Sequence, residues 1–490
     1  MSKATENPSS QAPATPATEP GATLLDGRLH ISVIVLWTLQ AFAPLAALWI
    51  ASSAERLVAL AGIAIALLSS WVRWTRFRWR IESDQLIIEH GLLQRTRRVI
   101  PIERIQAVQT VRKLRHRVFG VVGLRIETVG GDETEGQLDA LTPATAAATQ
   151  RLLLREAATT PAPSAQQPAG SVLARCTPQM LFVAGLTGGR VTVAAALLAG
   201  VQEFAGQRVI SAVMSAPERL GVTVVVILVL LGAAAAFLLS VVATAVTYWD
   251  FTVTRDGDLI RLHRGLLDER RDTVPLARVQ SLTIEENFIR RALGLAAVKM
   301  VVAGRAGKDE SVTSTLWPIG PRDQAFALVG DLLAVDGLDR IKLLPMPPAA
   351  RTRRLWRAAT AIVVVTAITL VVLAWPLGLV GLLVAGVAVP AALGAYRALG
   401  WRCHTVVTLA RRGVFVRRTS VTPVLAPQSL RVSSSPFQRR RDLATLRLEI
   451  ARTGRAGDPG MIDLARRDAE RLQLDLADLT AGLRDGPGGT

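Results

Sequence analysis

One spacing occurs three times in this chain and constrains its fold more than any other feature. It joins a Gly to a Pro ten residues later and to a Gln five residues after that. The three copies are Gly91, Pro101 and Gln106; Gly265, Pro275 and Gln280; and Gly413, Pro423 and Gln428. A spacing kept at three separate places is typical of an internal repeat. The sequence therefore predicts that one structural unit is used three times.

Each copy is predicted to fold as a small β domain that ends in a helix. Short stretches of alternating apolar and polar residues, broken by Gly, Asp or Ser, are typical of half-buried strands joined by tight turns. The Pro of each copy indicates the end of a strand, because it lacks an N–H donor. Helical stretches follow at residues 143–156, 321–333 and 462–476. We therefore expect three small antiparallel β-barrels or sandwiches of about 80 residues, each with a C-terminal helix.

The third copy departs from the spacing at one turn. Gly120 and Gly294 each follow the Pro of their copy by 19 residues, and Asp442 occupies this place in the third copy. The third copy is predicted to have the same strands as the other two. Its turn at Asp442 is not predicted to have the same geometry.

Two apolar runs precede each copy. They cover about residues 30–51 and 57–71, 180–201 and 220–246, and 356–375 and 377–399. A helix needs roughly 20 apolar residues to cross a bilayer, so the sequence predicts six transmembrane α-helices in three hairpins. Arg190 interrupts one run and is an intramembrane candidate, because ionisable groups inside a membrane mark functional sites. The alternative is a tilted segment from which Arg190 reaches the surface.

Positive charge gathers at one end of the predicted hairpins. The formal net charge is +18, and the segments RWTRFRWR (73–80) and RTRRLWR (351–357) flank the hairpins, whereas the connections within hairpins carry few charges. Lys and Arg accumulate on the cytoplasmic side of a membrane. We therefore expect both termini and all three β domains to be cytoplasmic.

These observations predict a multi-domain integral membrane protein with nine segments. They are a disordered N-terminal tail (1–27), hairpin 1 (28–75), domain 1 (76–157), a linker (158–176), hairpin 2 (177–247), domain 2 (248–338), a linker (339–353), hairpin 3 (354–399) and a divergent domain 3 (400–486).

The repeated motif resembles a known family. The segments GLLQRTRRVIPIERIQAV (91–108) and GLLDERRDTVPLARVQSL (265–282), each preceded by paired spans, are similar to the bacterial pleckstrin-homology-like (PH-like) domain of YdbS/YdbT-like membrane proteins. The resemblance implies a seven-stranded PH-like barrel capped by a helix in each repeat, in a multi-pass protein of the bacterial inner membrane. It also implies no enzymatic activity, a loose link to envelope stress or resistance to membrane-active compounds, and a smaller membrane protein with a related domain as a partner.

The sequence contains no pattern that predicts a catalytic, cofactor or metal site. The Gly-rich segment GGDETEG (130–136) lacks the Lys and hydroxyl of a phosphate loop, so we interpret it as a solvated loop. The five His residues have no metal-ligand spacing, and the two Cys residues lie far apart in the sequence. Nucleic-acid binding is disfavoured, because the basic turns lack aromatic residues that could stack on bases.

Basic residues recur at equivalent places in the three copies and are the candidate lipid- or partner-facing residues. They are Arg95, Arg97, Arg98, Arg270, Arg271, Arg417 and Arg418. Anionic lipids attract such residues by about 1 kcal/mol each, but the charges could equally reflect the ordinary cytoplasmic bias. The leading hypothesis is a non-enzymatic scaffold for lipid or protein interaction, with anionic lipids as the expected partners. The alternative is a transporter or exporter component in which the six spans form a pathway.

Overall fold

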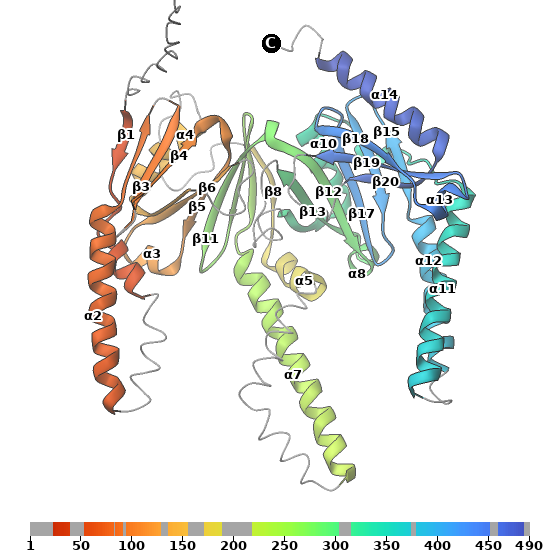
Figure 1. Cartoon of the computed structure of the whole chain (residues 1–490), viewed down its shortest axis with the longest axis horizontal. Helices are drawn as coiled ribbons and strands as arrows, with labels where there is room; N and C mark the ends of the chain where they lie inside the picture. Colours follow the sequence, from red (N-terminus) through yellow and green to blue (C-terminus); the bar gives the residue numbers. More distant parts are fainter. Residues whose placement is uncertain are drawn as a thin grey trace, which may run out of the picture. The chain divides into compact units, whose positions relative to one another are not determined.

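The computed structural model describes ten stretches of the chain, which form two compact units (Figure 1). The described residues are 23–39, 53–82, 84–91, 95–128, 136–154, 171–188, 218–302, 315–373, 379–450 and 459–484. The first unit is Met1–Arg104 with Ala148–Glu156, and the second is Ile105–Ala147 with Ala157–Thr490.

The first unit contains an antiparallel sheet of four strands. Its order is β1 (Thr23–Gly27), β2 (Arg78–Glu82), β3 (Gln85–His90) and β4 (Thr96–Pro101). The helix over residues 33–39 and α2 (Ser53–Arg76) lie in sequence between β1 and β2. The predicted N-terminal tail therefore ends too late, because residues 23–27 already form a strand.

The second unit contains three sheets. The seven-stranded sheet has the order β7 (Gly136–Leu141), β6 (Val122–Thr128), β5 (Ile105–Arg112), β11 (Glu269–Pro275), β10 (Leu259–Arg264), β9 (Thr252–Asp256) and β8 (Ser171–Arg175). The six-stranded sheet has the order β14 (Thr315–Pro321), β13 (Leu295–Val302), β12 (Val279–Asn287), β17 (Val416–Pro423), β16 (Val407–Arg412) and β15 (Gly400–Cys403). The last sheet is β18 (Pro427–Ser433), β19 (Leu443–Ile450) and β20 (Gly460–Ala465).

The larger two sheets each join two repeats. β5 of the first repeat pairs with β11 of the second, and β12 of the second pairs with β17 of the third. We call these two pairings the seams. The prediction of three self-contained barrels is wrong, since no sheet closes into a barrel among the residues that the structure describes. Strand edges that a lone domain would leave unpaired are instead satisfied by the neighbouring repeat.

The apolar core crosses the seams as well. One cluster centres on the second repeat, with Phe251, Leu282 and Trp317 at most 2% exposed. The same cluster includes Ala107 from the first repeat and Val421 from the third. Burial of apolar surface therefore holds neighbouring repeats together along with the strand pairing.

Each repeat has a short helix in a turn between two strands, and a longer helix at its end. The short helices are α3 (Leu114–Val118), α8 (Phe288–Ala292) and α13 (Pro436–Arg439). The closing helices are α4 (Pro143–Leu153), α10 (Arg322–Leu333) and α14 (Arg466–Arg484). The sequence interpretation missed the strand before each closing helix, namely β7, β14 and β20. Gly136 of the predicted GGDETEG loop begins β7, and the rest of that segment lies outside the described residues.

The repeated Gly residues occupy turns that no other residue fits without strain. Gly265 has φ of 106°, and a Cβ there would lie 2.0 Å from the backbone oxygen of Asp268. Gly413 has φ of 98°, with the corresponding contact at 1.9 Å from the oxygen of Val416. Asp442 has φ of 55° and so keeps the left-handed conformation of Gly120 and Gly294. Asp tolerates this conformation, so the third repeat preserves the turn that its sequence made doubtful.

Each helical hairpin is inserted into its β domain rather than placed before it. β1 and β2 flank the first hairpin and pair with each other, as β8 and β9 do around the second. Around the third, Leu344 and Trp401 form an isolated antiparallel bridge. The predicted linkers 158–176 and 339–353 therefore contain β8 and Leu344. Because the two flanking segments are paired, the chain leaves and re-enters each β domain at the same place.

Two described helices are long and apolar enough to cross a bilayer. They are Arg56–Arg76 within α2 and Leu230–Thr247 within α7 (Glu218–Thr247), with mean hydropathies of 1.8 and 2.2. The six predicted spans are thus not reproduced, because parts of the other runs lie outside the described residues and α5 (Pro178–Gly188) has only 11 residues. Arg190 lies outside the described residues, so its predicted intramembrane role is not addressed by the structure.

The helices of the second hairpin are in close contact. A Cβ on Gly185 of α5 would lie 2.9 Å from Cα of Val241 in α7. Small residues allow such close approach of backbones, which stabilises helix pairs in membranes. The third hairpin consists of α11 (Pro348–Leu373) and α12 (Leu379–Arg397).

Two arginines of the basic segment at the base of the third hairpin are largely buried in an ion-pair network. Arg353 and Arg354 of α11 reach Asp463 of β20, which is fully buried. The side chains of the two arginines are 16% and 19% exposed, and Gln438 donates a further hydrogen bond of 2.9 Å to Asp463. This buried carboxylate fastens the hairpin to the last sheet of the third repeat.

The Gly265→Ala substitution should destabilise the protein by about 3 kcal/mol or more, because it combines a disfavoured φ with a backbone clash. Gly257→Ala is the matched control, since Gly257 has φ of 57° but open space around it, and should cost about 1–2 kcal/mol. Thermal unfolding of the detergent-solubilised chain, followed by circular dichroism, measures both. Equal losses would show that the clash at Gly265 is relieved.

The Asp463→Ala substitution should destabilise the third repeat by about 3–5 kcal/mol, because it leaves two poorly exposed guanidinium groups without their carboxylate. Asp478→Ala on the exposed face of α14 should change the free energy of unfolding by less than about 0.5 kcal/mol. Urea denaturation of both variants compares the two. A loss at Asp463 no larger than at Asp478 would contradict the anchoring role.

Candidate functional site

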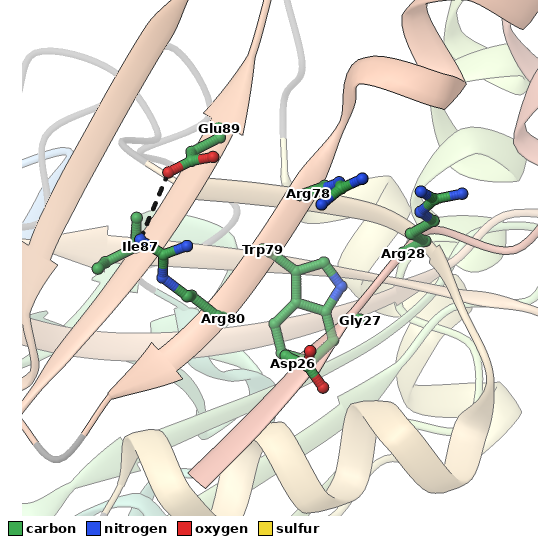
Figure 2. A pocket seen from close by; sticks show the side chains of 8 residues that line it. All are labelled: Asp26, Gly27, Arg28, Arg78, Trp79, Arg80, Ile87 and Glu89. Atoms are coloured by element: carbon green, nitrogen blue, oxygen red, sulfur yellow. Dashed lines mark ion pairs between the residues drawn. The ribbon is translucent and has the colours of Figure 1, made fainter. Parts of the chain in front are cut away.

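A basic pocket lies in the first repeat, at the point where β1 ends and β2 begins. It has a volume of about 250 Å³ and is lined by Asp26, Gly27, Arg28, Arg78, Trp79, Arg80, Ile87 and Glu89 (Figure 2). Gly27 faces Trp79 across the strand pair, and a Cβ on Gly27 would lie only 3.1 Å from the indole ring. The absence of a side chain at Gly27 therefore lets the Trp79 ring pack against the β1 backbone.

The pocket carries an excess of positive charge. Figure 2 shows Arg28 and Arg78 at one end and the ion pair of Arg80 with Glu89 at the other. Arg28 and Arg78 are exposed, and neither has a carboxylate within ion-pair distance among the described residues. Arg80 Nη2 lies 3.5 Å from Glu89. Arg80 also pairs with Glu82 at 3.0 Å, so the excess charge comes from Arg28 and Arg78 against Asp26, and it favours an anion.

The indole N–H of Trp79 has no acceptor in the described structure. Trp79 is 2% exposed, and its Nε1 is a buried donor without a hydrogen-bond partner. Figure 2 shows this nitrogen on the side of the ring toward Gly27 and Arg28. An unpaired buried donor costs about 1–3 kcal/mol. An oxygen atom of an anion in the pocket would supply the missing acceptor.

The pocket adjoins the base of the first hairpin. Its lining residues Arg28 and Arg78 immediately follow β1 and open β2, the two strands between which the hairpin is inserted. The indole N–H of Trp74 donates a 2.8 Å hydrogen bond to the Leu29 carbonyl, which ties the two ends of the hairpin together. The pocket therefore lies beside the segments that lead into a hairpin containing α2, a helix long and apolar enough to cross a bilayer.

The basic residues chosen from the sequence do not gather in this pocket. Arg95, Arg97 and Arg98 are exposed on or just before β4. Arg97 Nε lies 3.8 Å from the pocket residue Glu89, which therefore faces two guanidinium groups.

The other four chosen residues lie on the seam strands β11 and β17, and their lipid- or partner-facing role stays a prediction. Arg270 and Arg271 of β11 are opposite Val111 and Thr110 of β5. Arg417 and Arg418 of β17 are opposite Glu286 and Glu285 of β12, and Arg418 Nε lies 2.7 Å from Glu285.

The seams contain further charge networks. Asp272 and Arg264, both 1% exposed, form an ion pair of 3.0 Å, and the Gln109 amide of β5 donates to Asp272 at 2.5 Å. Nearby, a hydrogen bond from His263 lowers the pKa of Glu269 to about 2, with a further contribution from Arg271. Most of the arginines at the seams thus form ion pairs with nearby carboxylates.

The pocket residues Arg28, Trp79 and Arg80 were missed because the sequence placed them at a segment boundary and in a flanking basic run. Their signal was present in the alternating RWR of residues 78–80, which is typical of a strand with polar and apolar faces. The pairing of that strand with residues before the hairpin is a tertiary feature.

A second pocket of about 310 Å³ lies in the third repeat, between β18 and α14. It is lined by Thr408, Val424, Pro427, Gln428, Ser429, Leu430, Leu448, Gln473, Leu476, Ala477 and Thr480. None of these residues is charged, so this pocket offers no attraction to an anion.

Other chemistry finds little support in the described ranges. No group of three or more His, Cys, Asp or Glu side chains there could hold a metal ion. Burial raises the pKa of the Cys176 thiol to about 12 and that of Cys403 to about 11. The two thiols are therefore protonated at neutral pH and are poor nucleophiles.

Comparison with known proteins agrees with the repeated architecture. The family model of the bacterial PH domain matches the chain three times, at residues 34–157, 193–335 and 340–480. The UPF0699 transmembrane protein YdbT of Bacillus subtilis (strain 168) is 27% identical over 282 residues, which cover 52% of this chain and 57% of that protein. The chain thus aligns with little more than half the length of this relative. No solved structure matches.

The three family matches include both seams and most of the strands and closing helices described above, but not β1 or β8, and the similar protein carries the word transmembrane in its name. The chain is therefore a YdbT-like membrane protein that belongs to the bacterial PH domain family.

Proposed function

We propose that the chain is a non-enzymatic, membrane-anchored scaffold whose first repeat binds the headgroup of an anionic lipid. The observation that carries this proposal is the basic pocket at the base of the first hairpin, where among the described residues Arg28 and Arg78 have no carboxylate within ion-pair distance and the Trp79 N–H has no acceptor. A lipid phosphate provides oxygen acceptors for all three groups. Each basic residue close to an anionic surface contributes about 1 kcal/mol.

The pocket geometry favours a headgroup over a soluble protein ligand. It is small, about 250 Å³, and it opens beside the segment that enters the membrane. The seams support the scaffold role, because they hold successive repeats in a fixed register rather than on flexible linkers. Envelope stress and resistance to membrane-active compounds are the processes in which we propose that this scaffold acts.

We further propose that the protein lies in the bacterial inner membrane, with both termini and all three β domains in the cytoplasm. The basic segments beside the hairpins support this orientation. The paired strands around each hairpin support it too, because a hairpin held at both ends by one sheet returns to the side from which it started. No described contact favours the alternative of a transport pathway.

Binding of soluble short-chain lipids tests the proposed function. The detergent-solubilised full chain should bind dihexanoyl-phosphatidylglycerol more tightly than dihexanoyl-phosphatidylcholine. The double variant Arg28→Gln/Arg78→Gln should lose about tenfold or more in affinity for the anionic lipid. Trp79→Phe, which keeps the ring but removes the N–H donor, should lose about fivefold. Microscale thermophoresis measures these affinities.

Arg104→Gln is the matched control for lipid binding, since Arg104 is exposed in the same unit but lies outside the pocket. An unchanged affinity in the double variant, or a loss equal to that of the control, would refute the pocket as a headgroup site.

Protease accessibility tests the proposed orientation. In inside-out membrane vesicles trypsin should cut the arginine-rich exposed segments, including the edge strand β4, whereas right-side-out vesicles should protect them. Immunoblotting of terminal tags reads out the fragments. Cleavage of any of the three β domains in sealed right-side-out vesicles would contradict the cytoplasmic location.

A further inference from the structure

β4 of the first repeat corresponds to the seam strands β11 and β17 of the second and third repeats. Unlike them, it does not form a seam with any described strand. It is the last strand of the order β1-β2-β3-β4, and in the described part of the chain no strand pairs with its outer edge. Its counterparts β11 and β17 pair along that edge with β5 and β12 of the preceding repeat. In the described part of the chain, no strand of a preceding repeat lies along β4.

The two seams share one register. In each seam, the later repeat contributes the strand that ends at its Pro, and the earlier repeat contributes the strand that follows its own Pro. The residue four positions before the later Pro lies opposite the residue nine positions after the earlier Pro. Arg271 is opposite Thr110 in the first seam, and Thr419 is opposite Ile284 in the second. A geometry kept in both seams is a property of the repeat, so it also defines which residues of β4 would face an added strand.

Burial along β4 shows the effect of the missing neighbour. Val99 stands two residues before its Pro and is 44% exposed. At the same place Thr273 is 3% exposed and Val421 is fully buried. An apolar side chain on the edge of a sheet therefore remains open in the first repeat, although the seam covers this position in the others.

The charge of the β4 segment indicates what kind of strand would pair with its outer edge. At the seams, carboxylates meet guanidinium groups of the neighbouring repeat, as Glu285 meets Arg418 at 2.7 Å and Glu269 meets Arg117 at 3.7 Å. The segment from Arg95 to Pro101 contains three arginines and no carboxylate. Arg97 shares Glu89 with Arg80. The edge thus has positive charge that an acidic strand would balance.

We propose that β4 binds an acidic β-strand of another protein, added antiparallel to its outer edge in the register of the two seams. Main-chain hydrogen bonds would supply most of the affinity, as in other cases of strand addition to a sheet edge. A carboxylate opposite Arg95 and an apolar residue opposite Val99 would supply the specificity.

Strand β18 of a second copy of this chain does not fit this edge. β18 is the third-repeat counterpart of β5 and β12, and the described strands leave its outer edge unpaired. In the seam register, however, Arg431 of β18 would lie directly opposite Arg98, and residues 429–434 contain no carboxylate. Like charges directly opposite each other are destabilising, so β18 is not the partner strand.

The sequence of β12 serves as the probe, because it is an acidic strand that already forms a seam. In the common register a peptide VQSLTIEEN (Val279–Asn287) places Leu282 opposite Val99 and Glu286 opposite Arg95. The fluorescein-labelled peptide is titrated with the detergent-solubilised full chain, and binding is followed by fluorescence anisotropy. A peptide with both Glu residues replaced by Lys is the control.

The acidic peptide should bind at least about fivefold more tightly than the lysine peptide, and Arg95→Glu should reverse this preference. Arg104→Glu, an exposed residue of the same unit beyond β4, should leave both affinities unchanged. For the register, Val99→Cys should form a disulfide with a Leu282→Cys peptide faster than with a Thr283→Cys peptide.

Three outcomes would overturn the proposal. One is no binding of the acidic peptide up to about 1 mM, which would mean that the arginines only keep a bare edge solvated. Another is equal binding of the two peptides. The third is binding that Arg95→Glu does not affect, which would place the peptide at β18 or in an existing seam.

Discussion

Pairing of strands between repeats is the interaction on which the second unit depends. β5 with β11 and β12 with β17 turn what could be separate small domains into continuous sheets. A sheet edge exposes unpaired N–H and C=O groups, and here the neighbouring repeat satisfies them. The buried Asp272–Arg264 pair and the apolar cluster around Phe251 lie beside these pairings, so register, core and charge are specified together.

The position of the hairpins follows from the same sheets. Each hairpin interrupts its repeat between two segments that pair with each other, so membrane insertion does not break the β domain. Buried charge strengthens one of these junctions, where Asp463 holds Arg353 and Arg354. A basic run beside a span therefore has two physical roles in this protein, one toward the membrane and one toward the fold.

The basic pocket and the bare edge of β4 both belong to the first repeat. In the second and third repeats the corresponding edge pairs with another strand in a seam, and Arg271 and Arg418 there contact carboxylates. In the first repeat Arg28 and Arg78 lack carboxylate neighbours in the described residues, and Val99 is open. Among the described residues, the first repeat thus presents chemical groups that the other two repeats use for cohesion.

The sequence by itself determined the three repeats, their turn residues, most of their strands (though not β7, β14 and β20) and the hydrophobic runs. These depend on local spacing, on the conformational freedom of Gly265 and Gly413 and on the missing donor of Pro. It also determined the family. It did not determine the seams, the strands β1 and β8 ahead of the hairpins, or the pocket. Strand pairing joins residues more than 100 positions apart, as Asn287 with Val416, and no local pattern specifies which edges meet. Whether an arginine faces lipid, a carboxylate or solvent is therefore decided only by the tertiary structure.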